Sequence, residues 1–314
     1  MNPHPQGSIP LVAVVGPTAT GKTALAIALA ERLGGEIVNA DSRQIYRGMD
    51  IGTAKPSVED RQRVPHHLFD LIEPDQPFSL ADYLRLARET IAEIASRERL
   101  PLLVGGSGLY VRAVVHGLLP PPVAPDPTLR ASLEAAARSN PEPLLRELAE
   151  RDPATAARID PRNLRRVVRA LEVIRKTGRP FSEQRQTQPP RYRTTTIGLT
   201  LDRAALYARV DARVEAMVAG GWLEEVRRLR ERGFGSELPA MTSHGYREML
   251  AVLDGVLSLD EAKERIKRST HRLVRQQYAW FRTNDPSIVW LAADRPDLVE
   301  AAVAVLAGTA PGLR

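Results

Sequence analysis

The stretch from Ser8 to Gly34, SIPLVAVVGPTATGKTALAIALAERLG, decides how this chain folds. Leu11–Val15 is an unbroken apolar run, which predicts a buried strand, and the apolar spacing from about Lys22 predicts an amphipathic helix. Between them, residues 16–23 read GPTATGKT and fit the phosphate-binding pattern G-x-x-x-x-G-K-[ST], the P-loop, in the strand-loop-helix context that the pattern requires. The stretch therefore predicts a site for a di- or triphosphate.

The chemistry of this loop follows from its residue types. Glycines let the N–H groups of the loop curl around phosphate oxygens, and the N-terminus of the helix adds partial positive charge. Lys22 supplies a full charge, and the Thr23 hydroxyl can hold Mg²⁺. A chance match in a glycine turn is the alternative, and the flanking strand and helix argue against it. The expected phosphate-binding residues are Gly16, Pro17, Thr18, Ala19, Thr20, Gly21, Lys22 and Thr23.

Strand and helix patterns alternate along much of the chain. A short strand at Glu36–Asn39 is followed by a helix at 79–97, which begins at a serine, and by a third buried strand at 101–106. A strand pattern returns at 194–201, and 287–291 predicts an edge strand. We therefore expect an α/β fold, namely a P-loop NTPase-like, three-layer core with a parallel sheet and crossover helices.

A proline-rich break, PPPVAPDP at 120–127, interrupts this alternation. Beyond it, Leu129 to about Gln188 is charged, helical in pattern and poor in strands, so it predicts an inserted helical subdomain. We expect a flexible leader at 1–9, a catalytic core at 10–122 and 192–314, and a helical insertion subdomain at 123–191 that binds nucleic acid.

Composition bounds the classes of protein to which the chain can belong. Of its 314 residues, 43% are hydrophobic and 26% are charged, as in ordinary globular domains, and none is cysteine. Disulfides, thiolate zinc sites and cysteine nucleophiles are thus excluded. The apolar runs fall short of the about 18 residues that span a membrane. The N-terminus lacks the pattern of a signal peptide, so we expect a cytoplasmic protein.

The net charge of +6 suggests an anionic partner such as nucleic acid. Codon composition that favours arginine and alanine would produce the same excess of positive charge. Charge alone leaves both interpretations open.

Two segments that follow predicted strands carry candidate chemistry. Asp41 comes after the strand at Glu36–Asn39, and open α/β sheets bind ligands at the carboxyl ends of their strands. Alternatively, its side chain caps the next segment. The glycines of GGSGLY at 105–110 either make a tight turn or let the backbone and the Ser107 hydroxyl approach a ligand. An acid after the second strand, rather than after the third, suits a small transferase better than a hydrolysing motor.

Motifs along nearly the whole chain resemble one family, the tRNA dimethylallyltransferases, also called tRNA isopentenyltransferases. The resemblance runs from about residue 10 to 292, and DSRQIYRGMDIGTAKP at 41–56 is very specific. The other matching segments are GPTATGKT, PHHLFD, LLVGGSGLY, RRVVRALEV, LDRAALYARVDARVEAM, GYREML and QQYAWFR.

The resemblance implies an activity and its participants. The family transfers a dimethylallyl group from its diphosphate to the exocyclic amine of the adenine on the 3′ side of certain tRNA anticodons. The implied partners are dimethylallyl diphosphate and the anticodon stem-loop of tRNA, with Mg²⁺ as cofactor and no obligate protein partner.

The resemblance also implies roles for individual residues. The P-loop would hold the diphosphate, not ATP. Asp41 resembles the general base that takes a proton from the attacking amine. Ser107 stands where the family usually has a threonine, whose hydroxyl donates to the bridging oxygen of the leaving group. Arg209 resembles the diphosphate-binding arginine, and Arg213, four residues further on, is left open between a functional role and a solvated helix face.

The helix expected at Leu164–Lys176 suits a role in gripping RNA. Its apolar face consists of Leu164, Val167, Val168, Leu171 and Ile174, and its basic stripe of Arg165, Arg169 and Lys176. A solvated helix face is the alternative, and the matching segment of the family contacts tRNA. The tRNA-binding residues that the resemblance implies are Asp41, Ser42, Arg43, Gln44, Ser107, Arg130, Arg165, Arg166, Val167, Val168, Arg169, Gly245, Tyr246 and Arg247.

The long basic helix expected at Ala262–Arg282 has one mixed seam. Its members are Ile266, Thr270, Leu273, Gln277 and Trp280. Because threonine and glutamine are unusual on a purely apolar face, the seam is either partly exposed or borders the path of the prenyl group and the RNA.

The sequence also departs from the family in places. Ser243 and His244 stand where the family usually has an apolar residue before GYRE. Because lone histidines rarely identify a site, we predict that His244 packs against its neighbours. THRLVRQQYAWFR at 270–282 differs from the commoner TRRYAKRQ-x-x-WFR pattern.

Two other functions explain part of the sequence. A P-loop small-molecule kinase would place Lys22 on ATP and use Asp41 as the base for a hydroxyl, but it leaves the basic helical half of the chain without a role. A non-catalytic, nucleotide-gated RNA-binding module would need no base at Asp41.

Overall fold

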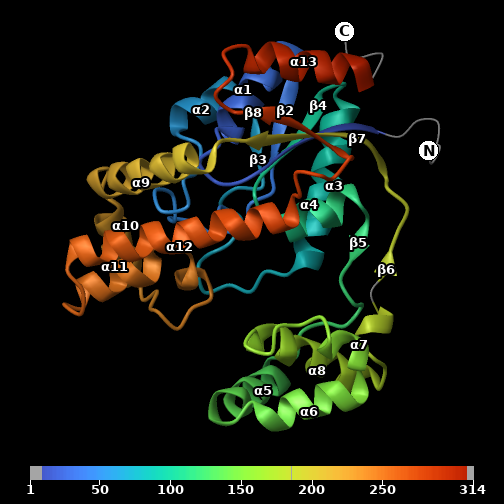
Figure 1. Ribbon diagram of the computed structural model, residues 1–314, viewed down its shortest axis with the longest axis vertical. Helices are drawn as coiled ribbons and strands as arrows, with labels where there is room; N and C mark the ends of the chain where they lie inside the picture. Colours follow the sequence, from blue (N-terminus) through green and yellow to red (C-terminus); the bar gives the residue numbers. More distant parts are fainter. Residues whose placement is uncertain (1–8, 185, 310–314) are drawn as a thin grey trace. The chain divides into compact units, whose positions relative to one another are not determined.

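The computed structural model describes residues 9–184 and 186–309 (Figure 1). The chain divides into two compact units, one made of Met1–Val115 with Pro190–Arg314 and the other of His116–Pro189. Within the described residues, no helix combines the length and the apolar character needed to cross a membrane.

The chain passes between the units at the ends of elements. It leaves the first unit where helix α4 (Gly108–Val115) ends, and it comes back just before strand β7 (Tyr192–Thr200). The division therefore does not coincide with the proline run at 120–127, on which the expected boundary at 123 was based.

A parallel sheet forms the centre of the first unit. Its strands, in hydrogen-bonded order, are β3 (His66–His67), β2 (Gly35–Asn39), β4 (Leu100–Val104), β1 (Ile9–Val15), β7 and β8 (Ile288–Ala292). Every neighbouring pair is parallel, and Val12 lies between Leu102 of β4 and Thr195 of β7. The expected parallel sheet and its edge strand β8 are confirmed. Strand β3 was not expected, because two residues are too few to show periodicity.

Most helices of the first unit begin at capping residues or glycines. They are α1 (Lys22–Leu33), α2 (Val58–Arg63), α3 (Leu80–Ser96), α4, α9 (Arg203–Ala219), α10 (Trp222–Glu231), η2 (Ala240–Thr242), α11 (Tyr246–Leu253), α12 (Leu259–Trp280) and α13 (Leu298–Thr309). Ser79 caps α3 by accepting from the N–H of Asp82, and Ser258 caps α12 by accepting from Glu261. The expected starts at Lys22 and Ser79 are confirmed.

The sheet lies between layers of helices. Helices α1 and α13 pack on each other and on alternate strand residues, among them Val12, Val14 and Leu102, in one buried cluster. The buried residues between these, such as Ala13 and Leu103, point to the opposite face. Helix α3 contacts β2 and β4. The expected three-layer α/β core is confirmed (Figure 1).

A second buried cluster joins the late helices to the loop that follows β2. Tyr46 and Met49 come from that loop, and Trp222, Tyr246 and Met249 come from α10 and α11. The loop that begins with Asp41 is therefore held by elements from the other end of the chain.

The second unit is mainly helical, as expected. Its elements are β5 (Leu118–Leu119), α5 (Pro127–Ser139), α6 (Glu142–Arg151), α7 (Pro153–Ala156), α8 (Leu164–Thr177), η1 (Ser182–Gln184) and β6 (Gln186–Thr187). Leu133, Leu148 and Leu171 lie in its apolar core. Strands β5 and β6 form a short antiparallel ladder, which the sequence pattern did not indicate.

Candidate active site

The P-loop has the backbone geometry of an anion-binding turn. Gly16, Ala19 and Gly21 adopt positive φ angles of 130°, 64° and 85°. A Cβ at Gly16 would stand 2.5 Å from the carbonyl oxygen of Leu199 in β7, so only glycine fits between the loop and the sheet. Gly21 precedes α1 without a side-chain cap, which leaves the first N–H groups of α1 available to a ligand.

Lys22 lies half-buried behind this loop. Its Nζ donates a hydrogen bond of 2.6 Å to the carbonyl oxygen of Pro17. Burial lowers the pKa of Lys22 to about 8, with the charge of Asp41 opposing this shift and that of Arg213 adding to it. A bound anion would favour the charged form of Lys22 and so raise its pKa.

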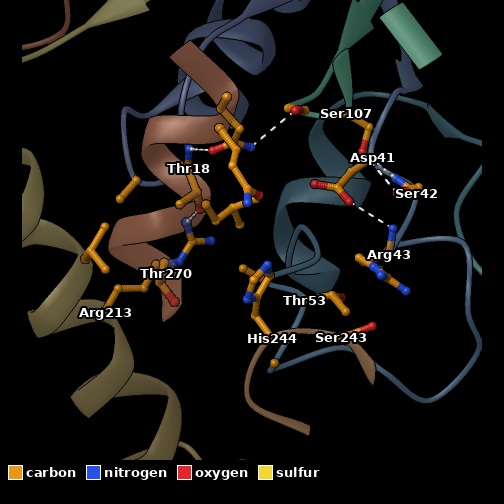
Figure 2. A pocket seen from close by; sticks show the side chains of 18 of the residues that line it. Thr18, Asp41, Ser42, Arg43, Thr53, Ser107, Arg213, Ser243, His244 and Thr270 are labelled. Carbon is orange, nitrogen blue, oxygen red and sulfur yellow. Dashed lines mark hydrogen bonds between the residues drawn. The ribbon is translucent and has the colours of Figure 1, made fainter. Parts of the chain in front are cut away.

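Asp41 is oriented by its neighbours at the end of β2. The buried Asn39 side chain accepts from the N–H of Asp41 at 2.9 Å and donates to the carbonyl oxygens of Asp41 and Leu68. The N–H of Arg43 donates to Oδ1 of Asp41 at 2.9 Å (Figure 2). The capping interpretation of Asp41 is confirmed, and its contact with a ligand stays a prediction. One oxygen caps the turn, and the other has no hydrogen-bond partner among the described residues.

Ser107 lies beside Asp41, at the start of α4 (Figure 2). Its Oγ accepts from the N–H of Ser42 at 2.9 Å and donates to Oγ of Ser42 at 3.2 Å. A Cβ at Gly105 would stand 2.2 Å from the carbonyl oxygen of Ala40, so the glycine turn lies directly against the chain that enters Asp41. The close approach expected for GGSGLY is therefore made to the protein's own backbone.

A cavity of about 410 Å³ opens in front of these groups. Asp41, Ser107 and Thr18 contribute polar atoms to it. Its apolar wall consists of Val210, Val214, Met217, Ile266 and Leu273. A smaller cavity of about 70 Å³, lined by Lys22 and Thr23, shares Thr18 and Asp41 with it. A polar, cationic end thus adjoins a larger apolar space.

Arg213, and not the expected Arg209, is the α9 arginine that lines the two cavities. Arg213 lines both cavities, and its Nη1 donates to Oγ1 of Thr18 at 3.4 Å (Figure 2). Burial lowers the pKa of Arg213, and the charge of Asp41 opposes this. Arg209 is exposed and lines neither cavity. Val210, Arg213, Val214 and Met217 line the larger one at helical spacing, a periodicity that could have identified Arg213 from the sequence.

Several residues that were expected to contact RNA are buried in the structure. Val167 and Val168 lie in the apolar core of the second unit. Tyr246 is fully buried, and its hydroxyl donates to Oε1 of Glu225 at 2.7 Å. Gly245, the fourth residue of this kind, packs on Trp222, because a Cβ there would stand 2.0 Å from the indole ring. The motif segments therefore include residues that hold the segments in place, and contact of these residues with tRNA stays a prediction.

The basic residues of α8 fall into two groups. Arg165 and Arg166 are exposed, as is Arg247 on α11. Arg169 and Arg130 instead donate to Oε2 of Glu172, at 2.7 and 2.6 Å.

Glu172 was missed because a single glutamate within an apolar pattern gives no signal. Its side chain is 0% exposed and also accepts from the N–H of Asp126 at 2.7 Å. Burial raises the pKa of Glu172, but hydrogen bonds from Arg130, Asp126 and Arg169 outweigh this and lower it.

The mixed seam of α12 faces the larger cavity. Ile266, Thr270, Leu273, Gln277 and Trp280 all line it. The expectation that this seam borders a path, rather than lying merely half-exposed, is thus consistent with the cavity. Thr270 projects towards the site from the same helix (Figure 2).

His244 lines the larger cavity, so the prediction that it packs was wrong (Figure 2). Burial lowers the pKa of His244, and the positive charges of Arg43 and Arg272 add to this. The neighbouring Ser243 is buried, and its hydroxyl donates to the carbonyl oxygen of Ala240. Of the two residues, only the serine is part of the packing.

Two buried charges hold the loop after Asp41, and sequence reasoning missed both. Glu225 accepts from the N–H groups of Asp50 and Ile51 at 2.8 and 2.7 Å. Lys55 donates to the carbonyl oxygen of Tyr46 at 2.6 Å and to Asp50 at 2.7 Å. Gln44, from the same loop, donates to the carbonyl oxygens of Thr53 and Ala54, both at 3.0 Å. The loop is therefore held by hydrogen bonds within it and by Glu225 of α10.

The chain matches two protein-family descriptions. Residues 44–284 match "IPP transferase" and residues 9–68 match "Isopentenyl transferase". The sequence is 56% identical over 299 residues to the tRNA dimethylallyltransferase of Roseiflexus sp. (strain RS-1), which covers 95% of this chain and 98% of that one. It is 50% identical to the tRNA dimethylallyltransferase of Thermomicrobium roseum, over 93% of this chain and 88% of that one.

Solved structures give the same relationship. The full-length tRNA isopentenylpyrophosphate transferase from Bacillus halodurans is 42% identical and superposes with a TM-score of 0.71, over 96% of both chains. A eukaryotic dimethylallyltransferase, crystallised while acting on tRNA, is 26% identical with a TM-score of 0.81, over 96% of this chain and 79% of that one.

Proposed function

Because the chain belongs to the family of tRNA dimethylallyltransferases, we propose that it transfers a dimethylallyl group from dimethylallyl diphosphate to tRNA. The acceptor is the exocyclic amine of the adenine on the 3′ side of the anticodon, and diphosphate is released. The observation that carries this assignment is that P-loop residues and Asp41 line the same two cavities, the larger of which has an apolar wall.

The reaction forms one bond and breaks another. The amine nitrogen attacks the allylic carbon, and the bond from that carbon to the bridging oxygen breaks, so that the electron pair leaves with the diphosphate. The amine proton passes to Asp41, which lines the cavity and has one carboxylate oxygen without a hydrogen-bond partner among the described residues. An aromatic amine is a poor nucleophile, so a carboxylate positioned to accept its proton lowers the barrier.

The leaving group becomes more negative as it departs, and the site has cations for it. Lys22, Arg213 and the N–H groups at the start of α1 all lie around the smaller cavity. The Ser107 hydroxyl, which now donates to Ser42, can turn to the bridging oxygen. Alignment of the two substrates and stabilisation of this charge are the main tasks of the protein.

Mg²⁺ fits the donors at this end of the site. Thr23 lines the smaller cavity, and no group of three or more His, Asp or Glu side chains suited to a metal occurs within the described ranges. Mg²⁺ is commonly held by one or two protein oxygens together with substrate phosphates and water, and the Thr23 hydroxyl would be such an oxygen. When bound, the ion neutralises charge on the diphosphate.

RNA recognition needs an adenine that has left its stack and a basic surface that grips the backbone. Arg43 and His244 line the larger cavity, where they can meet the extruded nucleotide. Arg165 and Arg166 project exposed from α8 of the second unit, for which we propose tRNA binding. We place the reaction in the cytoplasm, where tRNA is available.

Incubation with radiolabelled dimethylallyl diphosphate and unmodified tRNA tests this proposal. Label should enter the tRNA with release of one diphosphate per group transferred, and ATP should not replace the donor. Absence of transfer, together with phosphorylation of a small acceptor from ATP, would instead support the kinase that the first part of the sequence also fits.

A further inference from the structure

Gln277 of α12 connects the two loops that carry the polar end of the site. Its side chain is buried, with 6% exposure. Oε1 accepts a hydrogen bond of 2.8 Å from the N–H of Thr18 in the P-loop. Nε2 donates a hydrogen bond of 3.2 Å to the carbonyl oxygen of Gly106 in the glycine turn. A single amide thus bonds both loops, using one acceptor and one donor.

The glycines of the turn are explained by this contact. A Cβ at Gly106 would stand 2.2 Å from Nε2 of Gln277, and one at Gly108 would stand 2.3 Å from Cγ of Trp280. Gln277 and Trp280 are one helical turn apart, so they meet the turn from the same face of α12. Neither glycine has a positive φ angle. Their small size, rather than their backbone freedom, is what the structure uses.

The bond to Thr18 changes what the P-loop offers to a ligand. The Thr18 N–H is occupied by Gln277, so it does not belong to the donors that are open to phosphate in this arrangement. The Thr18 hydroxyl in turn accepts from Arg213. The bond to Gly106 fixes the residue that precedes Ser107. Gln277 thus ties the P-loop to the residue before Ser107, in addition to the pairing of β1 with β4 from which both loops arise.

We infer that Gln277 is a positioning residue for the transfer reaction. It holds the P-loop and the glycine turn in one frame, so that the cations around the diphosphate and the hydroxyl for its bridging oxygen act on the same leaving group. This role rests on the proposed function, because it takes the ligand of the P-loop to be an allylic diphosphate.

The test replaces the amide while keeping its size. Gln277→Met removes both hydrogen bonds, and it should weaken binding of inorganic pyrophosphate and raise the KM for dimethylallyl diphosphate by about tenfold, the effect of one net hydrogen bond. Gln277→Glu can still accept from Thr18 but cannot donate to Gly106 when ionised, and it adds negative charge beside the ligand. We expect a larger loss for this variant.

Three measurements separate positioning from a merely structural role. Gln62→Met is the control, because Gln62 is exposed on α2 and lines neither cavity; it should leave pyrophosphate affinity unchanged. The thermal midpoint of Gln277→Met should fall, because two buried hydrogen bonds are lost, but at a temperature where the variant is fully folded its tRNA affinity should stay close to wild type. Unchanged pyrophosphate affinity, or an equal loss of pyrophosphate and tRNA affinity, would overturn the inference.

Failure of the proposed function would be recognised separately. Pyrophosphate binding is measured by calorimetry without turnover, so it reports on Gln277 even if the wild-type protein transferred no dimethylallyl group. Absence of transfer by the wild type would sink the proposed function, whereas normal transfer with an unaffected Gln277→Met would sink only the positioning role.

Discussion

Two polar clusters within this chain both contain a carboxylate and arginines, but they differ in how many hydrogen bonds these groups make to one another. In the second unit, Glu172 accepts short hydrogen bonds from Arg130, Arg169 and the N–H of Asp126. In the cavity of the first unit, Asp41 has no ion pair among the described residues, and Arg213 makes one long hydrogen bond of 3.4 Å. Charged groups whose hydrogen-bonding atoms lack protein partners indicate a site for a ligand, whereas charged groups that bond to one another stabilise the fold.

The largest effect is expected when the carboxylate of Asp41 is removed. Asp41→Asn keeps an oxygen to accept from Arg43 but cannot take the amine proton, so turnover should fall by about 10²- to 10⁴-fold. Single-turnover transfer of labelled dimethylallyl groups measures this, while a filter assay follows tRNA binding. Near-normal turnover, or tRNA binding lost to the same degree, would contradict the role of Asp41 as base.

Arg209 and Arg213 of α9 provide an internal contrast. Arg213→Ala should raise the KM for dimethylallyl diphosphate by about 10- to 100-fold, because a hydrogen bond to a charged group contributes about 1.5–3 kcal/mol. Arg209→Ala is the control and should leave that KM unchanged, because the Arg209 side chain is exposed and lies outside both cavities. The opposite ranking would return the diphosphate contact to Arg209.

Changes to the cluster around Glu172 should alter the stability of the fold and not catalysis. Glu172→Gln removes the charge shared by Arg130 and Arg169, and should lower the free energy of unfolding by about 1–3 kcal/mol. The midpoint of urea denaturation measures this, and the KM for dimethylallyl diphosphate serves as the control. A raised KM with unchanged stability would mean that this cluster, too, serves the reaction.

The affinity for pyrophosphate should depend on pH through the protonation of Lys22. With a pKa of about 8, Lys22 loses its proton above that pH in the free protein, and a bound anion raises this pKa. Affinity for pyrophosphate should therefore be full below about pH 8 and fall by up to about tenfold per pH unit above it. Calorimetry across pH 7 to 9.5 checks this. In Lys22→Ala the affinity is lower throughout, and this decline should be absent.

The smallest effect is expected on the exposed face of α8. Replacing both Arg165 and Arg166 by alanine should weaken tRNA binding and make its salt dependence shallower, by about 0.7 in slope for each lost phosphate contact. Arg169 should not behave this way, since its guanidinium is held by Glu172. An unchanged slope in the double variant would assign Arg165 and Arg166 to a solvated face.

Much of the fold could be predicted because its signals are local. The strand before the P-loop, the helix after it and the capped start of α3 at Ser79 each depend on residues close together in the chain. Strand β3 could not be predicted, since its two residues have no pattern and pair with β2 only within the folded sheet.

The site was predicted unevenly for the same reason. Asp41 and Ser107 follow buried strands, and parallel strands bring their carboxyl ends to one edge, so their proximity follows from the sheet. Glu172 and Glu225 gave no signal, because what makes each important is the set of donors that surrounds it. Val167, Val168 and Tyr246 show the converse, since their motif membership reflects packing.

By itself, the sequence determined that GPTATGKT forms a P-loop, because strand, glycines and helix are contiguous and their geometry is local. Only the tertiary structure decided what completes that loop. Arg213 and Gln277 contact Thr18 from 195 and 259 residues further along the chain. Contacts of that separation depend on how α9 and α12 pack, which is set by burial of their apolar seams and not by any pattern near Thr18.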